Sequence, residues 1–141
     1  MNEWRSESLC YELLGTAQGV ETRLEAVLEP LGLSLAKFGA LAKLAAAGEP
    51  IPLGTLAERC ACVRSNITQL IDRLEADKLV ARVDDPRDRR SILAELTAEG
   101  RSRHAAAVRA VEKAERELFA HVPKPQCDDL VRLLRSVRAA R

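Results

Sequence analysis

The chain has 141 residues, of which 47% are hydrophobic, and its formal net charge is only +1. This length suits one domain with a sizeable core, and the apolar content and low charge exclude an intrinsically disordered chain. No apolar run approaches the roughly 18 residues of a membrane span, and the first residues lack the apolar segment of a secretory signal. Four cysteines in a chain of this size do not make a disulfide scaffold. We therefore expect a cytoplasmic protein without a membrane partner.

Apolar residues recur at helical spacing over most of the chain, and the core is aliphatic because aromatic residues make up only 3%. Pro30 and Gly32 end the first helix. Ser34 is a suitable N-cap for the second, and Gly48 ends it. The pattern predicts helices over 6–29, 35–47, 53–60, 64–77, 97–121 and 126–139.

Between the fourth and fifth helices, the hydrophobic period changes to two. Alternating apolar residues predict short strands over 79–84 and 92–96, joined by a polar turn over 85–90. The order helix, helix–turn–helix and hairpin defines a winged helix–turn–helix. The predicted fold class is therefore mainly α with a small β-hairpin wing.

The first, fifth and sixth helices do not belong to that minimal module, and their apolar stripes need a surface to bury. One small winged core cannot cover all of them. A two-fold homodimer is the commonest solution. We expect 1–32 and 101–141 to be dimerisation helices.

Two motifs resemble the MarR family of bacterial transcription regulators. One runs from Leu56-Ala57-Glu58-Arg59 through 64–75, and the other joins 85–90 to Leu96-Thr97-Ala98-Glu99-Gly100. The resemblance implies one MarR-like domain over 1–141, with a winged DNA-binding lobe over 34–100. It further implies a homodimer with interlocking terminal helices that binds pseudo-palindromic double-stranded DNA, usually as a repressor released by a small ligand or an oxidant.

A helical wheel places Ile67, Leu70, Ile71 and Leu74 on the inner face of the fourth helix. The outer face carries short hydrogen-bonding side chains, which suit base edges in a major groove. A solvated helix face is the alternative. We predict base or phosphate contacts by Ser65, Asn66, Thr68 and Gln69, and phosphate contacts by Arg64 and Arg73.

Two residues of this region do not fit the pattern easily. The Asp72 carboxylate on the outer face would repel phosphates, so it either pairs with a nearby arginine or lies beyond the groove. Val63 stands where the family often has Ser or Thr, and its side chain cannot cap the helix. A DNA phosphate is one candidate partner for the uncapped N–H groups.

The wing turn concentrates arginines, which suit the negative potential of a minor groove. By the family's Asp-x-Arg pattern, Arg90 would enter that groove and Asp88 would orient it. Arg87 and Arg89 would meet phosphates, each adding to the salt dependence of binding. The alternative is a solubilising turn stiffened by an Asp88–Arg90 pair.

The cysteines offer a redox alternative on the same fold. Cys10 is placed like the sensing thiol of the peroxide-responsive branch of the family, with Cys127 as a resolving partner across the dimer. That branch's paired tyrosines are replaced by Leu24 and Leu35, and the acidic neighbours of Cys10 do not lower a thiol pKa. Otherwise Cys10 is simply a small buried residue.

Cys60 and Cys62 lie at the turn of the helix–turn–helix. They could bind a soft metal or form a disulfide between subunits, but two thiols without a third ligand also suit a plain apolar turn. The sequence shows no phosphate loop, catalytic triad or histidine-rich motif. We therefore predict no enzyme, no cofactor and no resident metal.

An effector pocket is expected between the dimer helices and the winged core, with an aliphatic lining that suits an apolar or phenolic molecule. The candidate lining residues are Leu13, Ala17, Phe38 and Leu41. A winged module for protein–protein assembly without DNA binding is the alternative of another class. The operator, the regulated genes, the sign of regulation and the effector are not encoded in these patterns.

Overall fold

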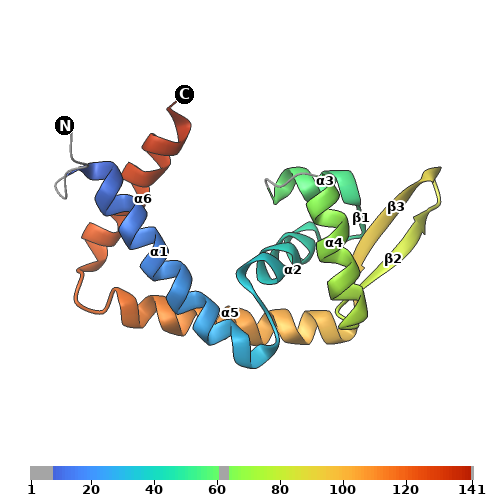
Figure 1. Ribbon diagram of the computed structural model, residues 1–141, viewed down its shortest axis with the longest axis horizontal. Coiled ribbons are helices and arrows are strands. Elements are labelled where there is room, and N and C mark those ends of the chain that lie inside the picture. Colours follow the sequence, from blue (N-terminus) through green and yellow to red (C-terminus); the bar gives the residue numbers. More distant parts are fainter. Residues whose placement is uncertain (1–7, 61–63, 141) are drawn as a thin grey trace, which may run out of the picture.

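The computed structural model describes residues 8–60 and 64–140, apart from the side chains of Arg64 and Ser65. The described part is mainly helical with a small antiparallel sheet, as the sequence predicted (Figure 1). Its elements are α1 (Leu9–Leu28), η1 (Glu29–Leu31), α2 (Leu35–Ala47), β1 (Ile51–Pro52), α3 (Leu53–Arg59), α4 (Arg64–Ala76), β2 (Val80–Asp85), β3 (Asp88–Leu96), α5 (Ala98–Leu118) and α6 (Lys124–Ala139).

Local side-chain chemistry explains where the helices begin and end. Ser34 Oγ accepts a hydrogen bond from the Lys37 N–H at 3.1 Å, which caps the start of α2. Thr97 Oγ1 accepts one from the Gly100 N–H at 2.9 Å and caps α5 in the same way. Gly48 closes α2 with a φ of +68°, a conformation that glycine adopts without strain. The predicted boundaries of these two helix starts are confirmed.

The sheet is larger than the predicted hairpin. Strand β1 adds to it, so the order is β1-β3-β2, with both pairs antiparallel. Ile51 pairs with Ala94 on one side of β3, and Arg82 pairs with Ala94 on the other. The strands of the wing also extend to the tip, because β2 ends at Asp85 and β3 begins at Asp88. The predicted six-residue turn is therefore wrong, and only Pro86 and Arg87 separate the strands.

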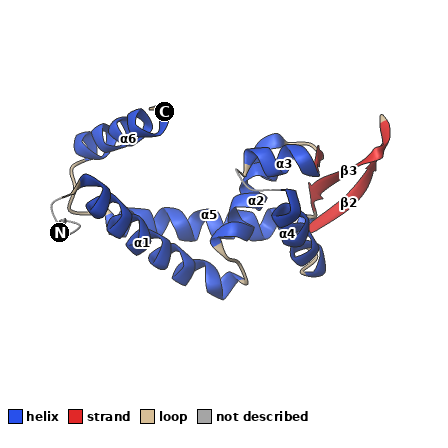
Figure 2. Ribbon diagram, turned by 45° about the horizontal axis from the view of Figure 1, so that its top comes forward, coloured by secondary structure: helices blue, strands red, loops and turns tan. Residues whose placement is uncertain are grey.

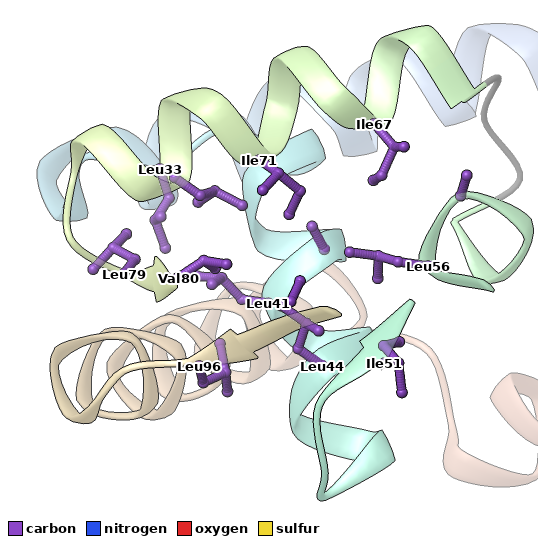
Figure 3. Close-up of a cluster of buried hydrophobic side chains, with 14 of the residues drawn as sticks. Leu33, Leu41, Leu44, Ile51, Leu56, Ile67, Ile71, Leu79, Val80 and Leu96 are labelled. Carbon is purple, nitrogen blue, oxygen red and sulfur yellow. The ribbon is translucent and has the colours of Figure 1, made fainter. Parts of the chain in front are cut away.

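One aliphatic core holds α2, α3, α4 and the base of the wing together (Figure 3). Its side chains converge from α4 on one side and from α2 and the sheet on the other. The fully buried large residues are Leu28, Leu41, Leu56, Ile67, Ile71, Leu74, Leu79 and Val80. Burying a leucine or isoleucine side chain contributes roughly 1.5–3 kcal/mol, so this cluster is the main source of stability in the described chain.

The chain bends by 76° between the segments Leu9–Leu31 and Leu35–Ala47. Arg103 of α5 holds this bend, because its Nη1 donates to the carbonyl oxygen of Leu31 at 2.6 Å. In the described part, no single helix is long and apolar enough to cross a membrane, although this bent pair passes on length and composition together.

The molecule has two regions joined by α5 (Figures 1 and 2). The winged lobe comprises α2 through β3. The arm comprises α1, the part of α5 that packs against α1, and α6, which has no buried residue. Arg23 of α1 and Glu117 of α5 form an ion pair that ties the two long helices of the arm together. Large apolar side chains are exposed along the arm, namely Leu9, Tyr11, Leu13, Leu14, Leu130, Val131, Leu133 and Val137.

Candidate nucleic-acid interface

Helix α4 presents an apolar face to the core and a polar face to the outside. Ile67, Ile71 and Leu74 are fully buried, as the helical wheel predicts. Leu70 is only half-buried, because it packs against the edge of the core and also lines an open cleft. The exposed side chains of the outer face are Asn66, Thr68, Gln69, Asp72 and Arg73. This face therefore carries amide, hydroxyl and guanidinium groups that point away from the core.

Several predicted features of this helix lie outside the described residues. They are the predicted contacts of the Arg64 and Ser65 side chains, the uncapped start at Val63, and the thiol of Cys62.

The Arg82 guanidinium on β2 lies between two carboxylates of α4. Its Nη2 is 2.5 Å from Oδ1 of Asp72, and its Nη1 is 2.9 Å from Oε1 of Glu75. The hydrogen bond that Asp72 accepts is the largest of the effects that raise the pKa of Arg82 above its ordinary value, against an opposing effect of burial. The expectation that Asp72 pairs with a nearby arginine is confirmed.

Sequence reasoning missed Arg82 and Glu75 as members of this group. The sequence contains only a weak signal for this contact, namely the outward position of Arg82 in an alternating strand. The side chain of α4 that Arg82 reaches depends on the angle at which the strand crosses the helix, and a sequence pattern does not contain that angle.

At the wing tip, two aspartates hold the backbone rather than the arginine side chains. Asp85 Oδ1 accepts a hydrogen bond from the Arg87 N–H, and Asp88 Oδ1 accepts one from the Arg90 N–H, both at 2.9 Å. Asp88 thus contacts the backbone N–H of Arg90 in a turn, and the predicted orienting of the Arg90 side chain by Asp88 stays a prediction. The side chains of Arg87, Arg89 and Arg90 are all exposed.

Helix α4 and the wing stand side by side at one end of the molecule (Figures 1 and 2). The end thus combines a helix with exposed hydrogen-bonding side chains and a hairpin with three exposed guanidiniums. Side chains of the first kind can read base edges, and those of the second kind suit phosphates or a narrow groove.

Comparison with known proteins agrees with this arrangement. A profile of the MarR family matches residues 31–91, from the α1–α2 bend into the wing. A search of curated proteins finds no match. Among solved structures, the transcriptional repressor CouR, determined bound to a 23-mer DNA duplex, is 28% identical and has a TM-score of 0.88. That alignment covers 97% of this chain and 99% of CouR. The family match and the structural matches together support a MarR-family winged-helix transcriptional regulator.

Two further MarR-type structures match over nearly the whole length. BpsR of Bordetella bronchiseptica is 26% identical with a TM-score of 0.88, and the alignment covers 100% of both chains. A MarR-family regulator from Rhodococcus sp. RHA1 is 26% identical with a TM-score of 0.83, covering 96% of this chain and 99% of that one. The likeness to solved transcriptional regulators thus includes the arm as well as the winged lobe.

An open cleft of about 630 Å³ lies beside α4. Leu35, Ala40 and Leu70 give it an apolar floor. Its charged lining residues among those described are Lys43, Arg59 and Arg73, all exposed cations, and no carboxylate lines the described part of the cleft. Asn66 and Gln69 also line it, so the cleft opens beside the outer face of α4.

The four residues expected to line an effector pocket do not meet within this chain. Leu41 is fully buried in the core, and Phe38 packs against that core and stacks on His104. Leu13 and Ala17 are exposed on α1. An effector pocket between the dimer helices and the winged core stays a prediction.

Within the described residues, no cysteine takes part in a disulfide. Cys10 is exposed on α1, and Cys127 is half-buried at the start of α6, with its Sγ 3.8 Å from the Val122 carbonyl oxygen. Cys60 is half-buried and lines the cleft. The described residues contain no group of three or more His, Cys, Asp or Glu that would hold a metal ion. Thiol sensing through Cys10 and Cys127 stays a prediction.

Proposed function

We propose that the chain acts as a homodimeric, sequence-specific repressor that binds a pseudo-palindromic DNA operator and leaves it when a small aromatic acid binds. The observation that carries the proposal is the pairing of an exposed polar face on α4 with three exposed arginines at the adjacent wing tip. A module used only for protein assembly needs no such concentration of cations on a hairpin.

The recognition helix would enter the major groove with its first turns. Asn66 and Gln69 carry amides that can donate to and accept from a base edge, and Thr68 adds a hydroxyl. Arg73, further along the same face, would reach a phosphate, as would Arg64 and Ser65 at the start of the helix. The negative charge of Asp72 does not oppose this docking strongly, because Arg82 neutralises it.

The wing would lie over the neighbouring minor groove. Arg90 is the predicted inserted residue, and Arg87 and Arg89 would contact the flanking phosphates. The Asp85 and Asp88 turns support this role by fixing the backbone from which the side chains project. A backbone held in advance loses less conformational entropy when the wing binds.

The arm supports the dimer. Leu14 of α1 and Leu133 and Val137 of α6 are each more than 60% exposed, and a concentration of exposed apolar side chains is typical of an interaction surface. A second copy offers the same apolar stripes, so a two-fold arrangement covers both sets at once. Such a dimer presents two α4 helices to two half-sites, as a pseudo-palindromic operator requires.

Binding to the chain's own upstream DNA, measured by fluorescence anisotropy at several salt concentrations, tests the proposal. We expect tight binding whose logarithm falls linearly with the logarithm of salt concentration. Arg90→Ala should weaken it at least tenfold, a loss of about 1.4 kcal/mol, with unchanged folding. Arg89→Ala should lower the salt slope by about 0.9, because the variant neutralises one phosphate fewer.

Arg109→Ala removes an exposed arginine of α5 and is the matched control, which should change affinity by less than twofold. Unchanged affinity in Arg90→Ala would overturn the wing assignment. Binding at the non-specific level alone, on that DNA and on selected random sequences, would favour protein assembly instead.

The cleft beside α4 suits the proposed effector. Its cations attract a carboxylate, its apolar floor accepts a ring, and an occupant would crowd Asn66 and Gln69. BpsR, whose DNA binding is regulated by 6-hydroxynicotinic acid, shows that a protein 26% identical to this chain responds to such an acid.

We would titrate the protein–DNA complex with 6-hydroxynicotinic acid as the probe. Release of DNA that disappears in Lys43→Gln and Gly39→Leu supports the cleft, since one change removes a charge and the other fills space. Gly39 lines the cleft, and a Cβ added there would meet nothing within 4 Å, so a side chain at this position starts in open space. Release that survives both changes would place the effector at the dimer surface near Leu13 and Phe38 instead.

A further inference from the structure

Arg82 connects the wing to the recognition helix through several bonds from one residue. Besides its ion pairs with Asp72 and Glu75, its backbone N–H donates to Oε2 of Glu75 at 3.1 Å. Its Nη2 also lies 3.5 Å from the backbone carbonyl oxygen of Thr68. The contacts thus reach three successive turns of α4 and involve both the side chain and the main chain of β2.

The position of Arg82 along the wing gives these contacts their importance. In the sheet, Arg82 pairs with Ala94, which is fully buried and is also the partner of Ile51 in β1. One pair further out, Val83 faces Leu93, and beyond it Asp84 faces Ile92, which is 38% exposed. From there to the tip, β2 and β3 pair with each other, and β1 no longer pairs with β3. Arg82 therefore lies at the level where the wing leaves the lobe.

We propose that Arg82 is a positioning residue that fixes the angle between the wing and α4, and that Asp72 serves DNA binding by holding Arg82 rather than by touching DNA. The inference rests on the proposed function, since it assumes that both α4 and the wing contact one operator. Two elements that must fit adjacent grooves together gain affinity when their relative angle is set before binding.

The proposal makes an unusual prediction about charge. Asp72 is a half-exposed carboxylate on the DNA-facing side of α4, with 59% of its side chain accessible. If long-range charge governed its effect, Asp72→Asn would remove a repulsion and tighten DNA binding. If Asp72 holds Arg82, the same substitution loosens the wing and weakens binding.

The test measures DNA affinity of Asp72→Asn and Arg82→Gln, each alone and in the Arg90→Ala background. We expect each to weaken binding about tenfold when Arg90 is present, and less than twofold when Arg90 is already replaced. This non-additivity follows because a wing that makes no groove contact gains nothing from being held at the right angle. Hydroxyl-radical footprints should lose the minor-groove protection at the operator flanks and keep the protection under α4.

Asp84→Asn is the matched control, since Asp84 is an exposed wing carboxylate beyond the contacts with α4. It should leave affinity unchanged or tighten it. Unfolding curves of all variants check the fold, and Arg82→Lys, which keeps the charge but not the two-pronged geometry, replaces Arg82→Gln if the latter unfolds.

Tighter binding by Asp72→Asn, or losses from Arg82 and Arg90 that simply add, would overturn the positioning role and make Arg82 a direct phosphate contact. That outcome leaves the regulator intact, because wild-type binding and its dependence on Arg90 would persist. Absence of specific binding by the wild-type chain would instead overturn the proposed function and this inference with it.

Discussion

The winged lobe and the arm are built from the same aliphatic residues but differ in what covers those residues. In the lobe, apolar side chains of α2, α3, α4 and the sheet bury one another (Figure 3). In the arm, α6 buries no residue, and leucines on α1 and α6 are exposed. The lobe thus buries its apolar side chains within one chain, whereas the arm leaves its own exposed. If the proposed dimer covers the arm, the stability of the fold and the stability of the assembly are separate quantities.

The strongest way to break the lobe without touching the arm's surface is Gly100→Ala. A Cβ at Gly100 would lie 2.0 Å from the backbone oxygen of Leu79, so the start of α5 could not stay against the base of the wing. We expect a loss of about 3 kcal/mol in the free energy of unfolding, the upper part of the range for overpacked sites. Urea denaturation measures it, and an unaltered midpoint would contradict this packing.

Its matched control is Gly39→Ala in α2, where the added Cβ meets nothing within 4 Å. That change should stabilise the chain by about 0.5–1 kcal/mol, because alanine has the higher helix propensity.

A substitution in the arm is expected to weaken the proposed dimer rather than the fold of the single chain. Leu133→Glu places a charge on a leucine that is already 62% exposed, so a single chain loses little by it. The proposed dimer would have to bury that charge, and we expect its dissociation constant to rise about 100-fold, or about 2.7 kcal/mol. Sedimentation at several concentrations measures this, with Arg135→Glu on the opposite side of α6 as control. An unchanged dissociation constant in Leu133→Glu would show that the dimer interface lies elsewhere.

A smaller effect compares helix starts in the two regions. Ser34 caps α2 in the lobe through its side chain, whereas Ser8 makes no such bond at the start of α1. Ser34→Ala should therefore cost about 1 kcal/mol of unfolding free energy, and Ser8→Ala almost none. Equal losses in thermal denaturation would show that α1 gains a cap in solution.

The smallest effect concerns the joint between the regions. His104 of α5 stacks on Phe38 of α2, with ring centroids 5.9 Å apart, and burial lowers the pKa of His104. The unfolded chain then binds a proton more readily than the folded one. This contribution to stability is complete above the unfolded pKa of about 6.5 and declines as pH falls from there toward the lower folded value.

Chemical denaturation between pH 8 and pH 5 should show this decline, and His104→Gln should remove it. Glu49, Glu95 and Arg101 are the charged residues that line the same hollow as His104. A decline that persists in His104→Gln would assign it to other groups.

The sequence was most informative where local chemistry decides the structure. The Ser34 cap and the α4 periodicity gave helices close to those observed, because these signals lie within a few residues of their effect. The wing tip was misjudged because Asp88, Arg89 and Arg90 carry no apolar alternation, yet β3 extends through them to the Asp85–Asp88 pair, past an irregularity in the register. Strand β1 was missed because two residues are too short to show a period.

The candidate site was predictable by residue type and not by geometry. The wheel correctly separated Ile67 and Ile71 from Gln69, since a helix fixes its own faces. It could not show that Arg82 crosses to Asp72 and Glu75, because that contact depends on how a distant strand packs. The cleft was hidden for the same reason, as its walls come from three helices.

Helix α5 runs unbroken for 21 residues, about 31 Å at 1.5 Å per residue, from the base of the wing into the arm. In the proposed dimer, the length of α5 therefore helps to set the distance between the two winged lobes. The separation of the two recognition helices, which must match half-sites about one DNA turn apart, is set by this length and by the angle at which two such rods meet. A tilt of about 5° at the arm displaces the far end by about 2.7 Å, given that length. In that dimer, the preference for operator spacing thus depends on residues of α5 and the arm, which lie away from the proposed DNA-binding surface.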